Sequence, residues 1–406
     1  MRQPRDLSTC SRSRHLAVIG ALLGACGAAE GAPTGGQAGP TTTAAATADG
    51  VDGVDLGAAD AIAIGAASTR GTIRAVHVVS RVGADGPADA SAKRARVADG
   101  VTLFALLEVD DGAAGPAARG KRTTRWYSDA GRVRWRGRLI ATAPLAAAPA
   151  ATLAWFRVEP AVASMSNEAS GNFRFEPVPY QATPLPAAGG MVVADVRPTL
   201  TPDHGDGVGT MRYQIVVAQG GRAIASPGTS AVRGRGSGGL TDDVHRVSLR
   251  HDDSYLGMLE EMYGQPYIWA SAGATDRVHQ SERLEGSDCA DLMVYGARRK
   301  GLDVPYGYTG SLGRHARTLA KGALAADGVY RDRKGAALPF TAVGDMVLFP
   351  RHVGALAEDR GVPGVLDQDD IMVHTLFDSP KRQRIAESGY ADNPVEVLRW
   401  NRLQAR

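Results

Sequence analysis

Cysteine is scarce in this chain, whose 406 residues include only Cys10, Cys26 and Cys289. So few cysteines exclude a small scaffold held by disulfides, and no C-x-x-C spacing is present for a structural zinc site. An H-E-x-x-H sequence is also missing, and the histidines show no spacing typical of metal ligands. We therefore expect neither a metal nor another cofactor, and the lone late cysteine, Cys289, needs another explanation.

An excess of one charge is also missing. Lys and Arg number 46 against 43 Asp and Glu, for a net charge of +3. The first 25 residues carry this excess, with four arginines against one aspartate, so the rest of the chain is neutral. Binding to nucleic acid needs a basic face, which excludes nucleic acid as an expected partner. The hydrophobic content of 44% is that of a globular protein, and the length allows two domains plus tails.

The apolar run near the N-terminus, LAVIGALLGA, is too short to span a bilayer. It follows a basic segment and ends in Leu-Gly-Ala directly before Cys26, and so resembles the signal peptide and lipobox of bacterial lipoproteins. This resemblance implies that residues 1–25 are removed, that Cys26 is lipidated, and that the protein is exported and anchored to a bacterial membrane by lipid. The alternative is an ordinary secretory signal peptide cut nearby, with Cys26 incidental.

Composition predicts three regions after the signal peptide. Residues 26–68 contain no aromatic side chain and are rich in Ala, Gly and Thr, as is typical of a flexible tether. Residues 69–240 contain short runs such as TIRAVHVVSRV and VTLFALLEVD between Gly, Pro and Asp clusters, which predicts an all-β, sandwich-like domain. That region has no motif that carries chemistry. Residues 241–406 mix helical and strand patterns and form the second predicted domain.

Cys289 lies at the start of a predicted helix in the sequence SDCADLMVYGARRKG. Asp288 is a suitable N-cap, apolar residues recur at helical spacing, and Gly301 is a suitable C-terminal cap. Free N–H groups and the helix dipole at such an end lower the pKa of a thiol, which favours a nucleophile. The alternative is a small buried thiol that only fills space.

A nucleophilic thiol needs a base, and His352 and His374 lie in two strand-like runs. The pair Pro363-Gly364 between these runs predicts a type II turn. A hairpin folded about this turn places the two histidines nearly opposite each other on one face, although a slip of one residue would separate them. The alternative is two unrelated strand histidines.

The segments GQPYIW, SDCADLMVYGARRKG, VGDMVLF and HVG, followed by a further histidine, resemble in their order the NlpC-type cell-wall cysteine peptidases, a papain-like family. The resemblance implies an α+β fold for residues 241–406, a papain-like domain with the nucleophile helix packed on an antiparallel sheet. It also implies that Cys289 is the nucleophile, His352 the base and His374 the third, orienting member. Tyr267 matches the tyrosine whose hydroxyl faces the thiol.

Neighbouring residues in the same motifs are expected to face the thiol or the substrate, namely Asp288 and Trp269. The chain also departs from the family pattern: DCAD replaces Asp-Cys-Ser-Gly and puts Asp291 on the second turn of the helix. There its carboxylate either raises the pKa of the thiol or selects a cationic group of the substrate. Tyr267 lies 22 residues before Cys289, and the insertion GATDRVHQSERLE adds a loop near the cleft.

These features predict an exported cysteine hydrolase that cleaves amide bonds of peptidoglycan stem peptides, a cysteine peptidase or amidase with a Cys-His-His site. Members of the resembled family often cut between D-glutamate and a diamino acid. One alternative is a catalytically inactive lipoprotein that binds cell wall or a protein. Another is a thiol-dependent acyltransferase or amidase on a non-wall substrate. The ligand of the β region and the oligomeric state stay open.

Overall fold

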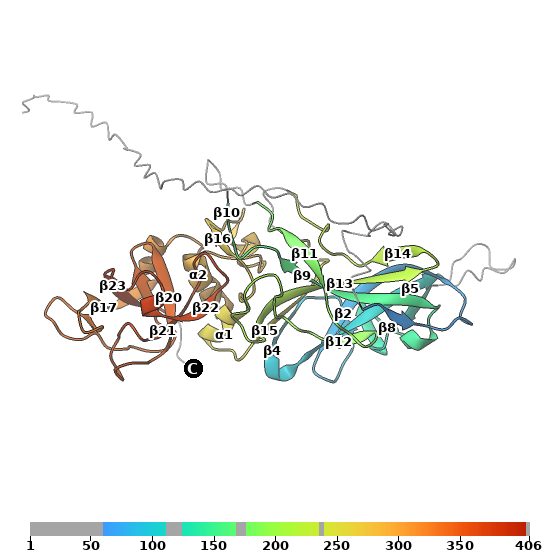
Figure 1. Cartoon of the computed structure of the whole chain (residues 1–406), viewed down its shortest axis with the longest axis horizontal. Helices are drawn as coiled ribbons and strands as arrows, with labels where there is room; N and C mark the ends of the chain where they lie inside the picture. The colour runs from blue at the N-terminus through green and yellow to red at the C-terminus, as the bar shows by residue number, and fades with distance from the viewer. Residues whose placement is uncertain (1–59, 111–123, 168–175, 235–238, 403–406) are drawn as a thin grey trace, which may run out of the picture. The chain divides into compact units, whose positions relative to one another are not determined.

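Two facing β-sheets form the framework of the described residues before position 250. The computed structural model describes residues 60–110, 124–167, 176–234 and 239–402 (Figure 1). The predicted signal peptide, Cys10, the predicted lipidation site Cys26 and the tether up to residue 59 lie outside this part.

The first sheet has the strand order β1-β9-β13-β15-β4, with β11 paired to β9 and β14 paired to β13. Its strands are β1 (Ile62–Ile64), β4 (Lys93–Arg96), β9 (Ala151–Pro160), β11 (Tyr180–Pro184), β13 (Gly209–Gln219), β14 (Arg222–Ala225) and β15 (His245–Arg250). The second sheet has the order β12-β5-β2-β3-β7-β8, with β6 paired to β5. Its strands are β2 (Thr72–Val82), β3 (Ala88–Asp89), β5 (Val101–Asp110), β6 (Thr124–Tyr127), β7 (Arg132–Trp135), β8 (Arg138–Ala141) and β12 (Met191–Val193).

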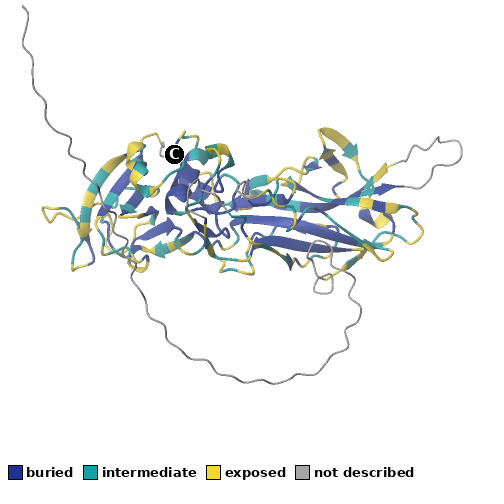
Figure 2. Cartoon of the chain, turned by 90° about the horizontal axis from the view of Figure 1, so that it is seen from above, coloured by how far each residue is buried: buried dark blue, intermediate teal, exposed yellow. Residues whose placement is uncertain are grey.

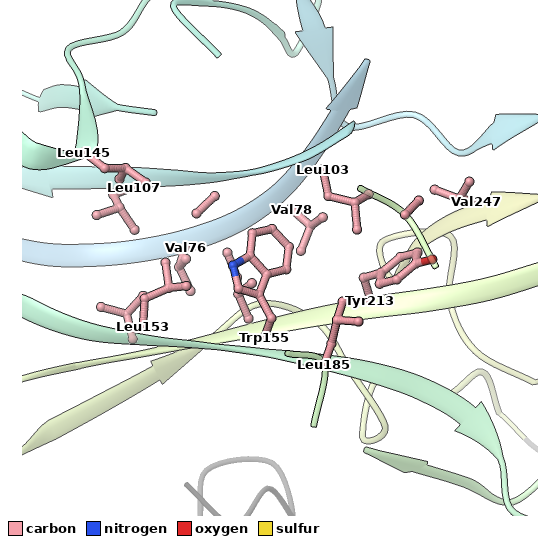
Figure 3. Close-up of a cluster of buried hydrophobic side chains, with 14 of the residues drawn as sticks. Val76, Val78, Leu103, Leu107, Leu145, Leu153, Trp155, Leu185, Tyr213 and Val247 are labelled. Carbon is pink, nitrogen blue, oxygen red and sulfur yellow. The ribbon is translucent and has the colours of Figure 1, made fainter. Parts of the chain in front are cut away.

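The two sheets share one apolar core, which Figure 3 shows in close-up. Val76, Val78 and Leu103 contribute from β2 and β5, and Trp155 and Tyr213 contribute from β9 and β13. Side chains of a strand alternate between its faces, so each of these long strands gives every second residue to the core. The dark strands in the middle of Figure 2 are those with this buried face.

A third sheet lies in the C-terminal part, in the order β18-β17-β23-β19-β20-β21-β22. Its strands are β17 (Ala316–Leu324), β18 (Tyr330–Arg331), β19 (Met346–Phe349), β20 (His352–Glu358), β21 (Ile371–His374), β22 (Lys381–Arg384) and β23 (Val395–Trp400). A two-stranded parallel sheet, β10 (Ser164–Ser166) with β16 (Tyr267–Trp269), joins the two halves of the chain. This pairing places Tyr267 opposite Ser164 and Trp269 opposite Ser166.

Helix is limited to short segments in the described residues. The α-helices are α1 (Tyr255–Glu260) and α2 (Cys289–Arg299), and the 3-10 helices are η3 (Val97–Asp99), η4 (Leu145–Ala147), η5 (Asp276–Val278), η6 (Thr309–Arg314) and η7 (Ile385–Glu387). No helix in this part of the chain has both the length and the apolar character needed to cross a membrane.

The predicted α+β fold, with a papain-like C-terminal domain, is wrong. Strand accounts for 42% of the described residues and is distributed over several sheets, whereas helix accounts for 11%. Residues 303–342 supply β17 and β18, and the residues after 378 supply β22 and β23.

The predicted domain boundaries stay predictions, although several contacts cross them. Residues 60–402, in their described part, belong to one compact unit. Strand β1 lies within the predicted tether and pairs with β9, and β15 lies within the predicted second domain and pairs with β13. Glu261 is fully buried and accepts hydrogen bonds from four side chains drawn from both regions, those of Arg94, Arg250, Tyr295 and Arg299.

Candidate active site

Cys289 is the first residue of α2, as the sequence predicts. Asp288 is the N-cap, and its side chain accepts a hydrogen bond from the backbone N–H of Asp291 at 2.9 Å. Gly301 follows the helix with φ of 86°, a left-handed conformation that glycine adopts at least cost. The predicted caps at both ends of this helix are therefore confirmed. Cys289 is a free thiol, and the residue is 7% exposed.

The surroundings of the thiol do not favour a thiolate. Burial, and then the carboxylate of Asp288, raise the pKa of Cys289 to about 12. The backbone N–H of Val353 donates a hydrogen bond to the sulfur and acts in the opposite direction, but with less effect. The lowered pKa expected at the helix start is thus outweighed by desolvation, and Cys289 is a neutral thiol at pH 7.

The Asp291 side chain is buried and hydrogen-bonded within the protein. It is 2% exposed and accepts hydrogen bonds from the Ser271 hydroxyl at 2.6 Å and from the Gly307 backbone at 3.2 Å. His279 Nε2 lies 3.5 Å from the same carboxyl group. Of the two roles weighed for this residue, an effect on the thiol has support, since Asp291 contributes to the raised pKa of Cys289.

His352 begins β20 and His374 ends β21. The two strands pair with Ala355 opposite Val373, so the residue opposite His374 is Gly354 rather than His352. This register differs by two residues from the predicted hairpin, and a shift of two keeps both histidines on the same face. The predicted turn is present, since Gly364 has φ of 78° and Val365 N–H bonds to the Val362 carbonyl.

The two imidazoles form a hydrogen-bonded chain. His352 Nε2 lies 2.9 Å from His374 Nδ1, and His374 Nε2 lies 2.8 Å from Gln383 Oε1. The Gln383 oxygen only accepts, so His374 donates to it from Nε2 and must accept from His352 at Nδ1. His352 is then protonated at Nε2, and its Nδ1 carries a free lone pair. That atom is buried and has no hydrogen-bond partner among the described residues.

Both rings are neutral bases at pH 7. Burial, and then His374, lower the pKa of His352 to about 3. Burial lowers the pKa of His374 to about 4. The ring of Tyr390 stacks on His352 at 4.5 Å between centroids and covers one side of it. The arrangement fixes the tautomer of His352 and leaves the lone pair of Nδ1 free, as in a catalytic histidine, but the lowered pKa makes this imidazole a weak base at pH 7.

Cys289 and His352 both lie next to the first peptide group of β20. The N–H that binds the Cys289 sulfur belongs to the peptide that joins His352 to Val353. The Val353 side chain packs in the same buried cluster as Cys289, whereas the His352 ring points to the other face of the strand. No hydrogen bond between Cys289 and His352 is present in this part of the chain, so the pair is adjacent but not joined.

Tyr267 and Trp269 reach the same region from β16. Burial raises the pKa of the Tyr267 hydroxyl, and the next contributions come from Cys289 and Asp288, which places this hydroxyl beside the thiol. The ring of Phe377 packs edge-on to Tyr267 at 5.5 Å. Trp269 is 49% exposed and Phe377 is 71% exposed, so two large apolar side chains face solvent near the thiol.

A groove of about 990 Å³ begins at Arg351, the residue before His352, and is lined by further basic side chains, including those of Arg333 and Lys334. Arg351 is the second residue of the two-residue turn that joins β19 to β20. Its φ of 69° is left-handed, a conformation in which a β-carbon is strained and glycine is favoured. The turn therefore carries strain directly beside the candidate base.

We expect Arg351→Gly to stabilise the protein by about 1 kcal/mol, because glycine relieves the left-handed strain at this turn. Urea denaturation at pH 7 measures the change. Arg351→Ala is the matched control: it removes the same side chain but keeps the β-carbon, so no such gain is expected. Equal stability of the glycine and alanine variants would contradict a strained turn.

Several residues of the site escaped the sequence analysis. Gln383 orients His374 from β22, Tyr390 covers His352, and Ser271 holds Asp291 and the backbone of Asp288. Gln383 lies in the short run KRQR, whose alternation is too brief to mark one polar residue as special. Among the residues that the structure describes, no three His, Cys, Asp or Glu side chains are placed to hold a metal ion.

Comparisons of this chain with protein-family models, with curated proteins and with solved structures found no match. The case for a function therefore depends on the geometry of the site and on its chemistry.

Proposed function

We propose that this chain is an exported cysteine hydrolase that cleaves amide bonds of peptidoglycan stem peptides through Cys289, His352 and His374. The observation that carries the proposal is the hydrogen-bonded chain His352–His374–Gln383, which ends in a buried lone pair beside the peptide group bound to the thiol. A neutral base with a fixed tautomer and a lone cysteine at a helix start are the parts of a thiol hydrolase.

The resting pair is a neutral thiol and a neutral imidazole, so the proton has to move during the attack. Sγ of Cys289 adds to the substrate carbonyl while Nδ1 of His352 takes the thiol proton. His352 then gives this proton to the leaving amine as the C–N bond breaks, and a thioester on Cys289 remains. Water hydrolyses the thioester with His352 again as base. Contacts of this kind are often loose before substrate binds and shorten in the complex.

The start of α2 also supplies a donor for the developing oxyanion. The backbone N–H of Cys289 is in the first turn, where no preceding helical carbonyl accepts it. A donor of this type is worth about 3 kcal/mol of transition-state stabilisation. The helix start thus supports the carbonyl oxygen in the transition state even though it does not ionise the resting thiol.

The substrate class is inferred from the ordered motifs around Tyr267, Cys289, His352 and His374, which resemble those of NlpC-type cell-wall peptidases. An exported protein held at a membrane by lipid on Cys26 reaches peptidoglycan from its anchor. Oligomerisation is not required by this proposal, because the proposed catalytic side chains come from one chain.

Purified peptidoglycan, digested with the wild type and with Cys289→Ala, tests the proposal. We expect new muropeptides with free amines in the wild-type digest and none above background with the variant, since the variant lacks the attacking atom. Cys289→Ser is the matched control for volume, and it is expected to retain the fold and to lose nearly all activity. An uncut wall in the wild-type digest would remove peptidoglycan as the substrate.

A binding protein without catalysis is the second candidate, and the raised pKa of Cys289 favours it. Labelling with iodoacetamide followed by peptide mapping separates the two. A hydrolase is expected to show labelling at Cys289 that slows at least tenfold when His352 is replaced. A binding protein is expected to show slow labelling that does not respond to His352.

A further inference from the structure

A cavity outside the candidate active site is lined by two arginines, Arg212, which is buried, and Arg246, which is half-buried with its Nε atom buried. It has a volume of about 320 Å³, and its lining includes Arg212, Thr241, Arg246 and Glu285. These residues come from β13, from the segment before β15, from β15 itself and from the segment that leads into α2. We call it the Arg246 cavity.

The acidic group of the cavity is already saturated. Glu285 is 1% exposed; its Oε2 accepts from the Tyr180 hydroxyl at 2.5 Å, and its Oε1 accepts from Arg212 Nη2 at 3.3 Å and from the Leu240 backbone at 3.2 Å. Arg212 is itself buried and bonds in addition to Gln265 and to the Leu284 carbonyl. The single negative charge of Glu285 is therefore shared with Arg212.

The charge of Arg246 is left without a counter-ion among the described residues. Its Nη1 donates to the Arg283 carbonyl at 2.5 Å, but its Nε is buried and has no hydrogen-bond partner in this part of the chain. Asp242, the other acid at the cavity, pairs at 2.7 Å with Arg233, and its side chain is 82% exposed. Burial, and then Arg212 and Arg94, lower the pKa of Arg246 to about 10, as expected for a crowded cation.

A second unpaired donor lies in the same lining. The Thr241 hydroxyl oxygen is buried and has no hydrogen-bond partner within the described ranges. A buried guanidinium N–H and a buried hydroxyl without partners each carry the full cost of desolvation. An oxyanion accepts from both and supplies the missing negative charge, and a guanidinium matches its geometry well.

We propose that the Arg246 cavity binds a small oxyanion, a carboxylate or a phosphate, with Arg246 Nε and the Thr241 hydroxyl as donors. The bound anion connects β15 to the segment before it, which carries Thr241. This site is separate from Cys289 and does not depend on the proposed hydrolase activity.

Thermal unfolding of the purified protein tests the proposal with sodium phosphate and sodium acetate as probes, against sodium chloride at equal ionic strength and pH 7. We expect a saturable rise of Tm by about 2–4 °C with at least one probe, and the stronger probe identifies the anion class. Titration calorimetry with the same probe is expected to show one saturable site.

Two variants and a control make the test specific. Arg246→Met keeps the length of the side chain, removes the charge and is expected to abolish the shift without lowering Tm in chloride. Thr241→Val is expected to weaken binding about 5-fold, the effect of one hydrogen bond. Arg132→Met removes an exposed arginine on β7 and is expected to leave the shift unchanged. Equal shifts in the wild type and Arg246→Met, or no saturation, would mean that the cavity holds only water.

Discussion

Replacement of His352 by alanine is expected to lower kcat/KM for muropeptide release by about 10²–10⁴-fold, the usual contribution of a general base. The structure gives the reason: the pKa of the thiol is raised to about 12, so at pH 7 almost no thiolate forms without a base. The candidate base is His352, whose Nδ1 is buried without a hydrogen-bond partner among the described residues and whose next residue, Val353, donates its backbone N–H to the thiol.

A substitution further along the same chain of hydrogen bonds is expected to lower kcat/KM by a smaller factor. Gln383→Ala leaves His374 unoriented but keeps both rings, so we expect a loss of about 10-fold rather than the full effect. His315→Ala, in a loop outside the site, is the matched control for the loss of an imidazole. Rates are measured with the same muropeptide mixture at pH 7 and pH 9. An activity that survives His352→Ala at pH 7 within a factor of three would exclude His352 as the base.

Acid is expected to destabilise the protein by about 2–4 kcal/mol between pH 6.5 and pH 5. Burial lowers the pKa to about 4 for three histidines and to about 3 for two more: His77, His245 and His374, and His279 and His352. In the unfolded chain these side chains bind protons near pH 6.5. Their stabilising effect is therefore complete above pH 6.5 and is lost as the pH falls toward 4.

Three carboxyl groups act in the opposite direction. Burial raises the pKa of Asp288 to about 6, that of Asp370 to about 7 and that of Asp291 well above its ordinary value, so their protonation favours the folded state as the pH falls. Five groups against three leave a net uptake of about two protons on unfolding near pH 5, less where solvent screens a partly exposed ring. Urea midpoints at pH 7, 6 and 5, at constant ionic strength, measure this slope.

His279→Phe is the variant for this measurement, because it removes one buried imidazole and keeps an aromatic ring stacked on Tyr306. We expect the slope of stability against pH to decrease by about one proton, whatever the change in absolute stability. A stability that is constant from pH 7 to pH 5 would show that these histidines are not buried in their neutral form.

The local features of the candidate site were predictable from the sequence. Asp288, Cys289 and Gly301 are capping and first-turn residues whose roles depend only on neighbours within the same helix. The turn at Pro363-Gly364 is likewise local, and period-2 spacing is enough to keep His352 and His374 on one face even though the register shifted by two residues. Capping and turn residues predict local structure well because their effect depends only on a few neighbouring residues.

The fold and the charge state of the thiol were not predictable in the same way. β17 lacks a regular alternation of polar and apolar residues, so its strand character comes from pairing with the distant β23. The pKa of Cys289 depends on burial by residues such as Tyr267 and Val353 and on the carboxylates of Asp288 and Asp291, whose positions follow from tertiary structure. A helix start alone predicts the opposite direction.

The Arg246 cavity also shows a limit of sequence reading. Arg212, Arg246 and Glu285 are ordinary charged residues in their own segments, and no motif marks them. They become a candidate site only when the fold brings β13, β15 and the segment before α2 together. The balance of positive and negative side chains matters there because all of them line the same cavity.

Detection of a thioester on Cys289 tests the central claim most directly. The wild type is mixed with peptidoglycan stem peptides, quenched in acid after milliseconds to seconds, and mapped by peptide mass spectrometry. We expect an acyl group from the cleaved stem peptide on the peptide that contains Cys289, present before product accumulates and absent from Cys289→Ala. Products that form at the same rate while Cys289 stays unmodified, or in its absence, would contradict the claim that this thiol is the nucleophile.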